Sequence, residues 1–499
     1  MSEVAIVFDC GATNVRAVAV DVGGGIVAAC GAPNGPVAQP GGGGLIWDMD
    51  ELWGKLSAAC REVVAAAPGA RIRAVTCTTF GADGAPVDAA GKQTYPVISW
   101  ADAERTEEQI RQVSADPGGW PLFSRTGYQI ISFDTLLKLL WLRRHAPEAL
   151  DQAETFLMTP GLLSRRLSGE NSIDPTIAGT GMLMDMARRD WAPELLARAG
   201  LTPEFFPRWV EPGEVIGQVH AAAAADTGLP VGTPVVAAGH DTQFALFGAG
   251  ARPEEAVLSS GTWEILLVRS DTYTATEEGF RAGLMIEADA VAGFWNPQLL
   301  MMGSGVLEWV KGSFFPGASG DEGYEQMRAA AEAVPVGAGG VTFLPSFVRD
   351  SGPTARYGVP GAILGLSLQT SPGQVYRAAL EGLCFQMRWA LEILASGAGF
   401  SARGLRVVGG GSRNDLWNQL RADISGLPVT VIAQKEATVL GASRFAFLGA
   451  GVFGDLTEAQ SALHLEETRF EPGAGQGQYE ELYQRFRTLP AALADFSRA

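Results

Sequence analysis

A strand, a glycine-threonine turn and a second strand occur twice in this chain, once at its start and once past its middle. The first copy covers residues 4–20 around a turn at 9–14, and the second covers residues 256–268 around a turn at 260–262. Such self-similarity indicates two copies of one structural unit. Because a chain of 499 residues exceeds the size of a single hydrophobic core, we expect at least two domains.

Strands and helices alternate around both copies. Helical spacing at 48–67 precedes a strand at 72–79, and a strand at 405–408 runs into a helix that starts at Asp415. This alternation predicts an α/β fold. Glycines and an Arg-Pro pair interrupt the chain between the two copies, so we place the boundary between a domain at 1–247 and a domain at 248–499.

Charge and cysteine content disfavour several classes of function. The chain has 37 Lys and Arg against 55 Asp and Glu, a net charge of −18, and it has no basic run that would neutralise nucleic-acid phosphates. Its five cysteines are widely spaced and follow no disulfide or zinc pattern. No signal-peptide pattern precedes the first strand, and no stretch of about 18 apolar residues occurs. We therefore expect a cytoplasmic protein that binds neither nucleic acid nor membrane.

Three glycine-containing turns suit phosphate binding. In the first turn Gly11 lets backbone N–H groups approach phosphate oxygens, and Asp9 suits the Mg²⁺ ion that accompanies a nucleotide. The local sequence alone favours a plain hairpin turn with a capping aspartate. The turn at 260–262 is uninformative by itself and becomes a second candidate phosphate site only as the counterpart of the first turn. The glycine run at 409–414 lies between a strand and a helix, where a ligand can approach the helix N-terminus.

Two further strand ends carry polar residues. Asp241 follows a short strand at 235–238 and is placed to accept a proton from a hydroxyl group, while His240 beside it can hydrogen-bond a substrate. The alternatives are a structural histidine and a helix-capping aspartate. Residues 80–84 form either a loop that faces a ligand or a tight turn, and the local sequence favours the turn.

Taken together, these motifs resemble the FGGY carbohydrate kinases from residue 4 to about residue 451. Residues 133–145 match the first signature of that family, and residues 361–381 match the second. The stretches at 9–17, 238–251, 258–266, 304–310 and 408–414 are most similar to those of family members that act on L-fuculose. The resemblance implies two ribonuclease-H-like domains of the actin-like ATPase type, with a cleft between them.

The resemblance also implies roles for individual residues. Asp241 takes the place of the catalytic base, and Asp9 that of the acid near Mg²⁺. The residues implied for ATP binding are Gly11, Thr13, Asn14, Gly261, Thr262, Gly410, Gly411 and Asn414. Those implied for the sugar are Gly81, Asp83, His240 and Thr242, with Asn296 as a weaker candidate.

The activity implied is ATP-dependent phosphorylation of the 1-hydroxyl of L-fuculose, with ATP and Mg²⁺ as cofactors. Alternatives are another ketose, such as L-rhamnulose, ribulose or xylulose, and a non-catalytic nucleotide-binding regulator of the actin-like fold. The segment at 100–105 departs from the family's Trp-x-Asp-x-Arg spacing, which leaves the sugar contacts open. A homodimer is also left open.

Overall fold

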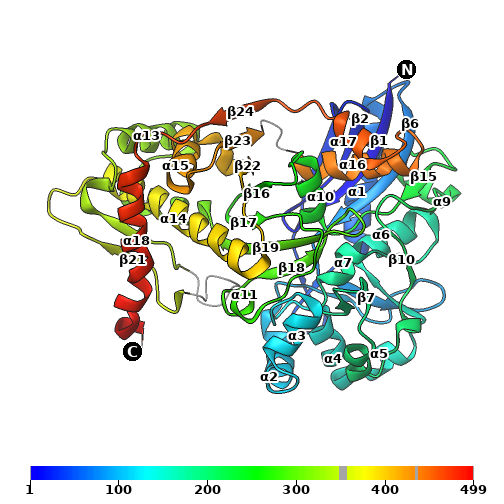
Figure 1. Ribbon diagram of the computed structural model, residues 1–499. Coiled ribbons are helices and arrows are strands. Elements are labelled where there is room, and N and C mark those ends of the chain that lie inside the picture. The colour runs from blue at the N-terminus through cyan, green and yellow to red at the C-terminus, as the bar shows by residue number, and fades with distance from the viewer. Residues whose placement is uncertain (1, 348–356, 433–435, 498–499) are drawn as a thin grey trace.

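Two mixed β-sheets organise the computed structural model, which describes residues 2–347, 357–432 and 436–497 (Figure 1). The first sheet has the order β14-β15-β6-β1-β2-β3. Its strands are β1 (Glu3–Cys10), β2 (Asn14–Asp21), β3 (Ile26–Pro33), β6 (Arg71–Thr79), β14 (Val215–Gln218) and β15 (Pro234–Val236). The second sheet, in the order β24-β23-β22-β16-β17-β19-β18, is built from β16 (Glu255–Ser260), β17 (Trp263–Leu267), β18 (Met285–Ala288), β19 (Trp295–Met302), β22 (Gly404–Val408), β23 (Val429–Ile432) and β24 (Glu467–Phe470).

The two sheets share one pairing pattern. In the first, β1 pairs antiparallel with β2 and parallel with β6, and in the second, β16 pairs antiparallel with β17 and parallel with β22. The next strands also correspond, because β15 and β23 are parallel to their inner neighbours while β14 and β24 are antiparallel. Strand β18 is an addition at the edge of the second sheet. The predicted α/β fold with a repeated unit is confirmed.

Helices cover both sheets. Those before the second sheet are α1 (Met49–Ala66), α2 (Glu107–Ala115), α3 (Gly119–Thr126), α4 (Thr135–His145), α5 (Pro147–Asp151), α6 (Thr159–Ser168), α7 (Pro175–Gly179), α8 (Pro193–Leu196), α9 (Ala221–Thr227) and α10 (Asp241–Gly248). Later helices are α11 (Glu277–Arg281), α12 (Ser304–Phe314), α13 (Gly320–Glu332), α14 (Pro372–Ala398), α15 (Asp415–Ser425), α16 (Ala437–Gly449), α17 (Leu456–Ser461) and α18 (Gln476–Ala492). In the described part of the chain, none of them is long and apolar enough to cross a membrane.

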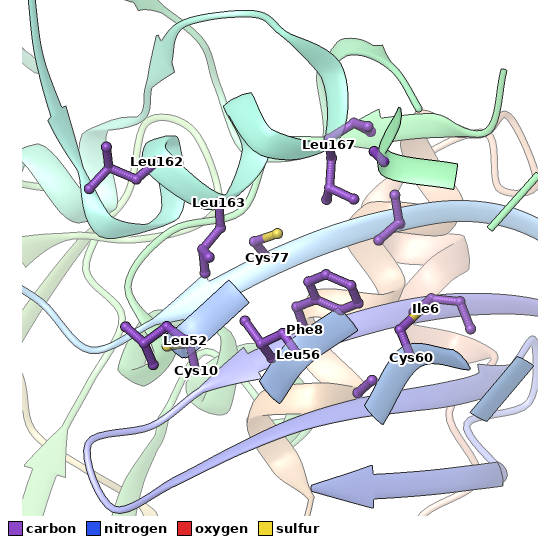
Figure 2. Packing of buried hydrophobic residues seen from close by; sticks show 14 of the residues in the cluster. Ile6, Phe8, Cys10, Leu52, Leu56, Cys60, Cys77, Leu162, Leu163 and Leu167 are labelled. Carbon is purple, nitrogen blue, oxygen red and sulfur yellow. The ribbon is translucent and has the colours of Figure 1, made fainter. Parts of the chain in front are cut away.

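Strand β1 is buried along almost its whole length because side chains pack on both of its faces. Helices α1 and α6 supply one layer, which Figure 2 shows as leucines gathered around Phe8 and Ile6. The thiols of Cys10, Cys60 and Cys77 lie in this same apolar layer, and all five cysteines are free. Burial raises the pKa of the Cys60 thiol to about 12, which keeps it protonated and unreactive.

The helices α10 and α16 cross between the two sheets (Figure 1). Apolar residues of α16 pack on the first sheet beside Val7 and Val18, although α16 lies late in the chain. Leu246 of α10 packs on the second sheet with Val257 and Val408. Each sheet is therefore covered in part by a helix that follows the strands of the other.

Glycines at the crossing let the two helix backbones touch. A Cβ on Gly441 would lie 1.9 Å from the carbonyl oxygen of Phe244, and one on Gly248 would lie 1.9 Å from that of Ala437. No larger residue fits at either position without separating the helices. The predicted domain boundary, between 247 and 248, falls at the last residue of α10.

Replacing one crossing glycine tests how far the fold depends on this contact. We expect Gly441→Ala to lower the free energy of unfolding by about 1–3 kcal/mol, because the added methyl group overpacks a rigid backbone contact. The measurement is the urea unfolding midpoint. Gly54→Ala on α1 is the matched control, since its Cβ meets open space, and it should gain about 0.5–1 kcal/mol. Equal midpoints for the two variants would contradict this account.

Candidate active site

The motifs picked out in the sequence lie at the carboxyl ends of neighbouring parallel strands. The turn at 9–14 follows β1, the segment at 80–83 follows β6, and Asp241 lies just beyond β15. In the second sheet, the turn at 260–262 follows β16 and the glycine run follows β22. Open α/β sheets bind their ligands at this edge, and here two such edges are joined by α10.

The backbone around His240 is held by the first half of the chain. Thr79 N–H donates to the carbonyl oxygen of Gly239 at 3.0 Å, and His240 N–H donates to Oγ1 of Thr176 at 3.0 Å. A Cβ on Gly239 would lie 2.4 Å from Oδ2 of Asp174, so the chain passes too close for any other residue. These contacts fix the direction in which His240 and Asp241 project.

Asp241 is the first residue of α10 and faces a cavity between the two halves. Its side chain is 30% exposed, and it lines a cavity of about 180 Å³ with Thr242, Ser259, Val408 and Thr438. Burial raises the pKa of Asp241; His240 opposes this rise and the charge of Asp9 adds to it. A carboxylate of raised basicity that faces a cavity suits a general base.

Two larger cavities, of 390 and 460 Å³, lie beyond the far end of α10, around Arg252 and Thr457.

His240 joins Asp241 to a buried glutamate. Its Nε2 lies 3.5 Å from Oδ1 of Asp241, and its Nδ1 donates to Oε2 of Glu287 at 2.9 Å. Burial alone would lower the pKa of His240, but the nearby carboxylates, Glu287 first, outweigh burial and raise this pKa to about 9. The imidazole is therefore charged at neutral pH.

The turn after β1 carries an ion-pair chain. Arg16 lies directly opposite Asp9 in the β1–β2 hairpin and pairs with its carboxylate, and Nη1 of Arg16 lies 2.7 Å from Oε2 of Glu436. Thr13 and Asn14 are exposed at the tip of the turn, and Gly11 N–H donates to the Asn14 carbonyl at 2.9 Å. An arginine with partners in both halves thus lies beside the first candidate phosphate turn.

The second candidate phosphate turn and the glycine run share one buried network. Nη2 of Arg421 donates to Oγ of Ser260 at 2.7 Å and to Oε1 of Glu264 at 2.5 Å, and both charged side chains are 1% exposed. Nη1 of Arg421 donates to Asn418, which in turn donates to the carbonyl oxygen of Ser412 at 2.7 Å. Arg421 on α15 therefore holds the two segments together.

Glycines permit this contact. A Cβ on Gly411 would lie 2.1 Å from Oγ of Ser260, whereas one on Gly410 would meet open space. Gly261 and Thr262 lie at the surface of the turn, and Thr262 is exposed. Asn414 caps α15 by accepting from Trp417 N–H at 3.1 Å, and it donates to the hydroxyl of Tyr376. The N-terminus of α15 lies at the same edge of the sheet, after β22.

On the predicted sugar side, Asp83 is fully buried. Its carboxylate pairs with Lys138, accepts from Trp47 Nε1 at 2.6 Å and accepts from Trp100 N–H at 2.9 Å. It thereby fixes Trp100, whose side chain is 40% exposed. Gly81 packs against Thr180, where a Cβ would lie 2.9 Å from Cγ2. In this structure the Asp83 carboxylate is buried and engaged by donors of the protein itself.

Thr242 and Asn296 complete the predicted set. Oγ1 of Thr242 donates to Oδ1 of Asp241 at 3.2 Å. Asn296 is opposite Glu287 in the β18–β19 pair and is fully buried, and both polar atoms of its amide lack a hydrogen-bond partner among the described residues. Buried amides are normally satisfied, so this one is expected to bind a water molecule or a ligand hydroxyl.

Arg16, Glu287 and Arg421 are among the charged residues that the sequence reasoning missed. The hairpin register alone would have paired Arg16 with Asp9, since the two are opposite across the first turn. No local signal marks Glu287 or Arg421, whose partners lie 47 and 157 residues away in the sequence.

Comparison with known proteins decides the family. Residues 4–248 match the N-terminal domain of the FGGY family of carbohydrate kinases, and residues 256–450 match its C-terminal domain. The chain belongs to this family. It is an ATP-dependent sugar kinase with the two-domain α/β fold of that family, and its predicted resemblance is confirmed.

Individual relatives agree with this assignment. The chain is 41% identical to an L-fuculokinase from Escherichia coli strain K12, over 94% of this chain and 97% of that protein. It is 36% identical to an L-fuculokinase from Haemophilus influenzae, over 94% and 99%. Among solved structures, xylulose kinase from Rhodospirillum rubrum superposes with a TM-score of 0.90 at 26% identity, covering all of both chains.

The Arg421–Glu264 pair of this sugar kinase gives a stability test. Arg421→Leu leaves Glu264 buried without its cation, so we expect a loss of about 3–5 kcal/mol in the free energy of unfolding. The double variant Arg421→Leu/Glu264→Leu removes both charges and should regain most of that loss. Urea unfolding measures both, and a double variant as unstable as the single one would contradict the pairing.

The same double variant also tests binding. We expect its KM for ATP to rise, because Arg421 no longer connects the turn at 260–262 with the glycine run, while its KM for the sugar stays near the starting value.

Proposed function

We propose that the protein transfers the γ-phosphoryl group of ATP to the 1-hydroxyl of L-fuculose, giving L-fuculose 1-phosphate and ADP. The observation that carries the chemistry is Asp241, a carboxylate of raised pKa that faces a cavity lined by both halves. The choice of sugar is supported by the L-fuculokinases, which match nearly the whole chain. We assign the sugar side to residues 1–247 and the ATP side to residues 248–499.

Asp241 accepts the proton of the attacking hydroxyl in this proposal. Phosphoryl transfer depends chiefly on positioning and on stabilising charge, so one positioned base suffices for the proton. His240 and Thr242 flank the base and bind the sugar, and Gly81, Asp83 and Asn296 belong to the same side. Exclusion of water by closure of the two halves would protect ATP from hydrolysis.

The nucleotide phosphates would lie between the two turns and the glycine run. Gly11, Thr13 and Asn14 approach them from the first half, and Gly261, Thr262, Gly410, Gly411 and Asn414 from the second. Arg16 lies next to the first turn, where Asp9 and Glu436 pair with its guanidinium group. Backbone N–H groups and the N-terminus of α15 suit phosphate oxygens.

Asp9 fits a magnesium ion that arrives with ATP. Asp9 raises the pKa of Asp241 through its charge, and its carboxylate is already paired with Arg16, so Mg²⁺ would bind the remaining lone pairs of Asp9, directly or through water. Among the described residues no group of three or more His, Cys, Asp or Glu side chains is arranged for a metal, so the phosphates and water would supply the remaining ligands. When bound, Mg²⁺ neutralises charge on the phosphates.

We also propose that the reaction takes place in the cytoplasm, which the five free thiols support.

A substrate panel tests the proposal directly. ADP release is measured with L-fuculose, L-rhamnulose, ribulose and xylulose, and we expect the highest kcat/KM with L-fuculose. A different preferred ketose would overturn the choice of L-fuculose as substrate but not the assignment as a sugar kinase. No ADP release with any of the four sugars would overturn the proposed function.

Asp241→Asn tests the base. We expect kcat to fall by about two to four decades while the Kd for the sugar, measured by calorimetry, changes little, because the amide keeps the shape but cannot accept the proton. Asp50→Asn is the control: Asp50 is 90% exposed in the first turn of α1 and should leave kcat unchanged. Near-normal turnover by Asp241→Asn would show that Asp241 is not the general base.

A further inference from the structure

Glu287 is a buried carboxylate from the second half of the chain whose partners all belong to the first. It lies on β18 and is 1% exposed. Its two oxygens accept from Nδ1 of His240 at 2.9 Å, from Nε2 of Gln243 at 2.6 Å and from the hydroxyl of Tyr128 at 2.9 Å. A buried carboxylate with three donors is satisfied only in its charged form.

Backbone contacts fix the place of this carboxylate. Ile286 N–H donates to the carbonyl oxygen of Gly127 at 2.7 Å, and Nε2 of Gln129 donates to the carbonyl oxygen of Leu284 at 2.8 Å. A Cβ on Gly127 would lie 2.2 Å from the carbonyl oxygen of Ile286, so the two segments are in direct backbone contact. Strand β18 is therefore docked on the first half at the residues that flank Glu287.

The electrostatics agree with this geometry. Burial alone would raise the pKa of Glu287, but His240 and the hydrogen bonds of Tyr128 and Gln243 outweigh it and lower that pKa. Asp241 on α10 and Asp174 at the start of α7 also face His240 and favour its charged form. With Nδ1–H donated to Glu287, the other ring nitrogen also carries a proton and lies 3.5 Å from Oδ1 of Asp241.

We propose that Glu287 is a positioning residue, which fixes the ring of His240 and keeps its Nε2 a hydrogen-bond donor beside Asp241. This inference rests on the proposed function, in which His240 and Asp241 meet the sugar. Because Glu287 comes from the second half, the sugar side of the site is complete only when β18 is docked on the first half. Glu287 itself touches neither substrate.

Glu287→Gln is the variant of choice. The side chain keeps its size, but one of its oxygens becomes an NH₂ group that faces donors, and the negative charge is lost. Loss of a charged hydrogen bond predicts a fall of about 10- to 100-fold in kcat/KM for the sugar, with the KM for ATP unchanged.

The pH profile separates positioning from simple stability. In the wild type, kcat/KM for the sugar should fall on the alkaline side as His240 loses its proton near its pKa of about 9. Removing the anion lowers that pKa, so in Glu287→Gln the alkaline limb should move toward neutral pH by about one unit or more. Glu287→Asp retains the charge and should restore part of the wild-type profile.

Glu381→Gln is the matched control. Glu381 is also a buried glutamate, 3% exposed, and it bonds to Arg377 and Tyr479 on the far side of the second half. It should lose stability as Glu287→Gln does while its alkaline limb stays in place. An alkaline limb that moves equally in both variants, or in neither, would overturn the proposal.

A titration that needs no activity separates this inference from the proposed function. The chain has four histidines, so ring ¹³C NMR of the labelled protein follows each one, and His240→Gln identifies the signal of His240. The His240 signal should titrate near pH 9 in the wild type and at least about one unit lower in Glu287→Gln. The same titration in both proteins would overturn the role of Glu287. A wild-type protein inactive on all four ketoses would overturn the proposed function instead. The titration would still show whether Glu287 keeps His240 charged.

Discussion

The crossing of α10 and α16 is the contact on which both halves of the protein depend. Carbonyl oxygens of one helix lie where a Cβ of the other would be, at Gly248 and Gly441, so the axes are as close as backbones allow. Phe445 fills the space beside the crossing, edge-on to Phe244 and Phe247. Because each helix also covers the sheet of the other half, the crossing fixes where the two strand edges meet. Asp241 is the first residue of α10, so the proposed base is carried by the element that joins the halves.

Buried charges hold each segment of the site in place. Lys138 pairs with Asp83 on the proposed sugar side, Arg421 pairs with Glu264 beside the turn at 260–262, and Glu287 pairs with His240 beside Asp241. Ion pairs of this kind contribute little net stability, because desolvation offsets much of their attraction. Their main effect is to fix geometry. A buried charged side chain is satisfied in few orientations, so each pair holds its two segments in one relative position. The exposed turns can then remain rich in glycine and open to ligand.

The sequence predicted the parts of the fold that depend on neighbouring residues. Alternating apolar residues and a glycine turn define the β1–β2 and β16–β17 hairpins, and Asp48 and Asn414 cap their helices as short-range signals. Most candidate site residues lie at the ends of predicted strands, and the family resemblance supplied their roles. Asn296, which lies inside β19, was named from the resemblance alone. Pairings between distant segments were out of reach, since no period or spacing links His240 with Glu287 or Ser260 with Arg421. Nor could the sequence tell that Asp83 faces Lys138 and Trp47, because that depends on how α4 packs.

A proposed base carried by one half, beside a histidine held by the other, would give the enzyme a structural condition for activity. If Glu287 belonged to the first half, His240 would be held in place whether or not the halves were docked. Since Glu287 lies on β18, a displaced β18 would leave His240 beside Asp241 and Asp174 without its main counter-charge. The imidazole would then lose its proton at lower pH and Asp241 would lose a cation beside it. In the proposed mechanism, the Glu287–His240 pair would therefore make the chemistry depend on the assembled structure, in which the segment of β18 contacts Gly127 and Gln129.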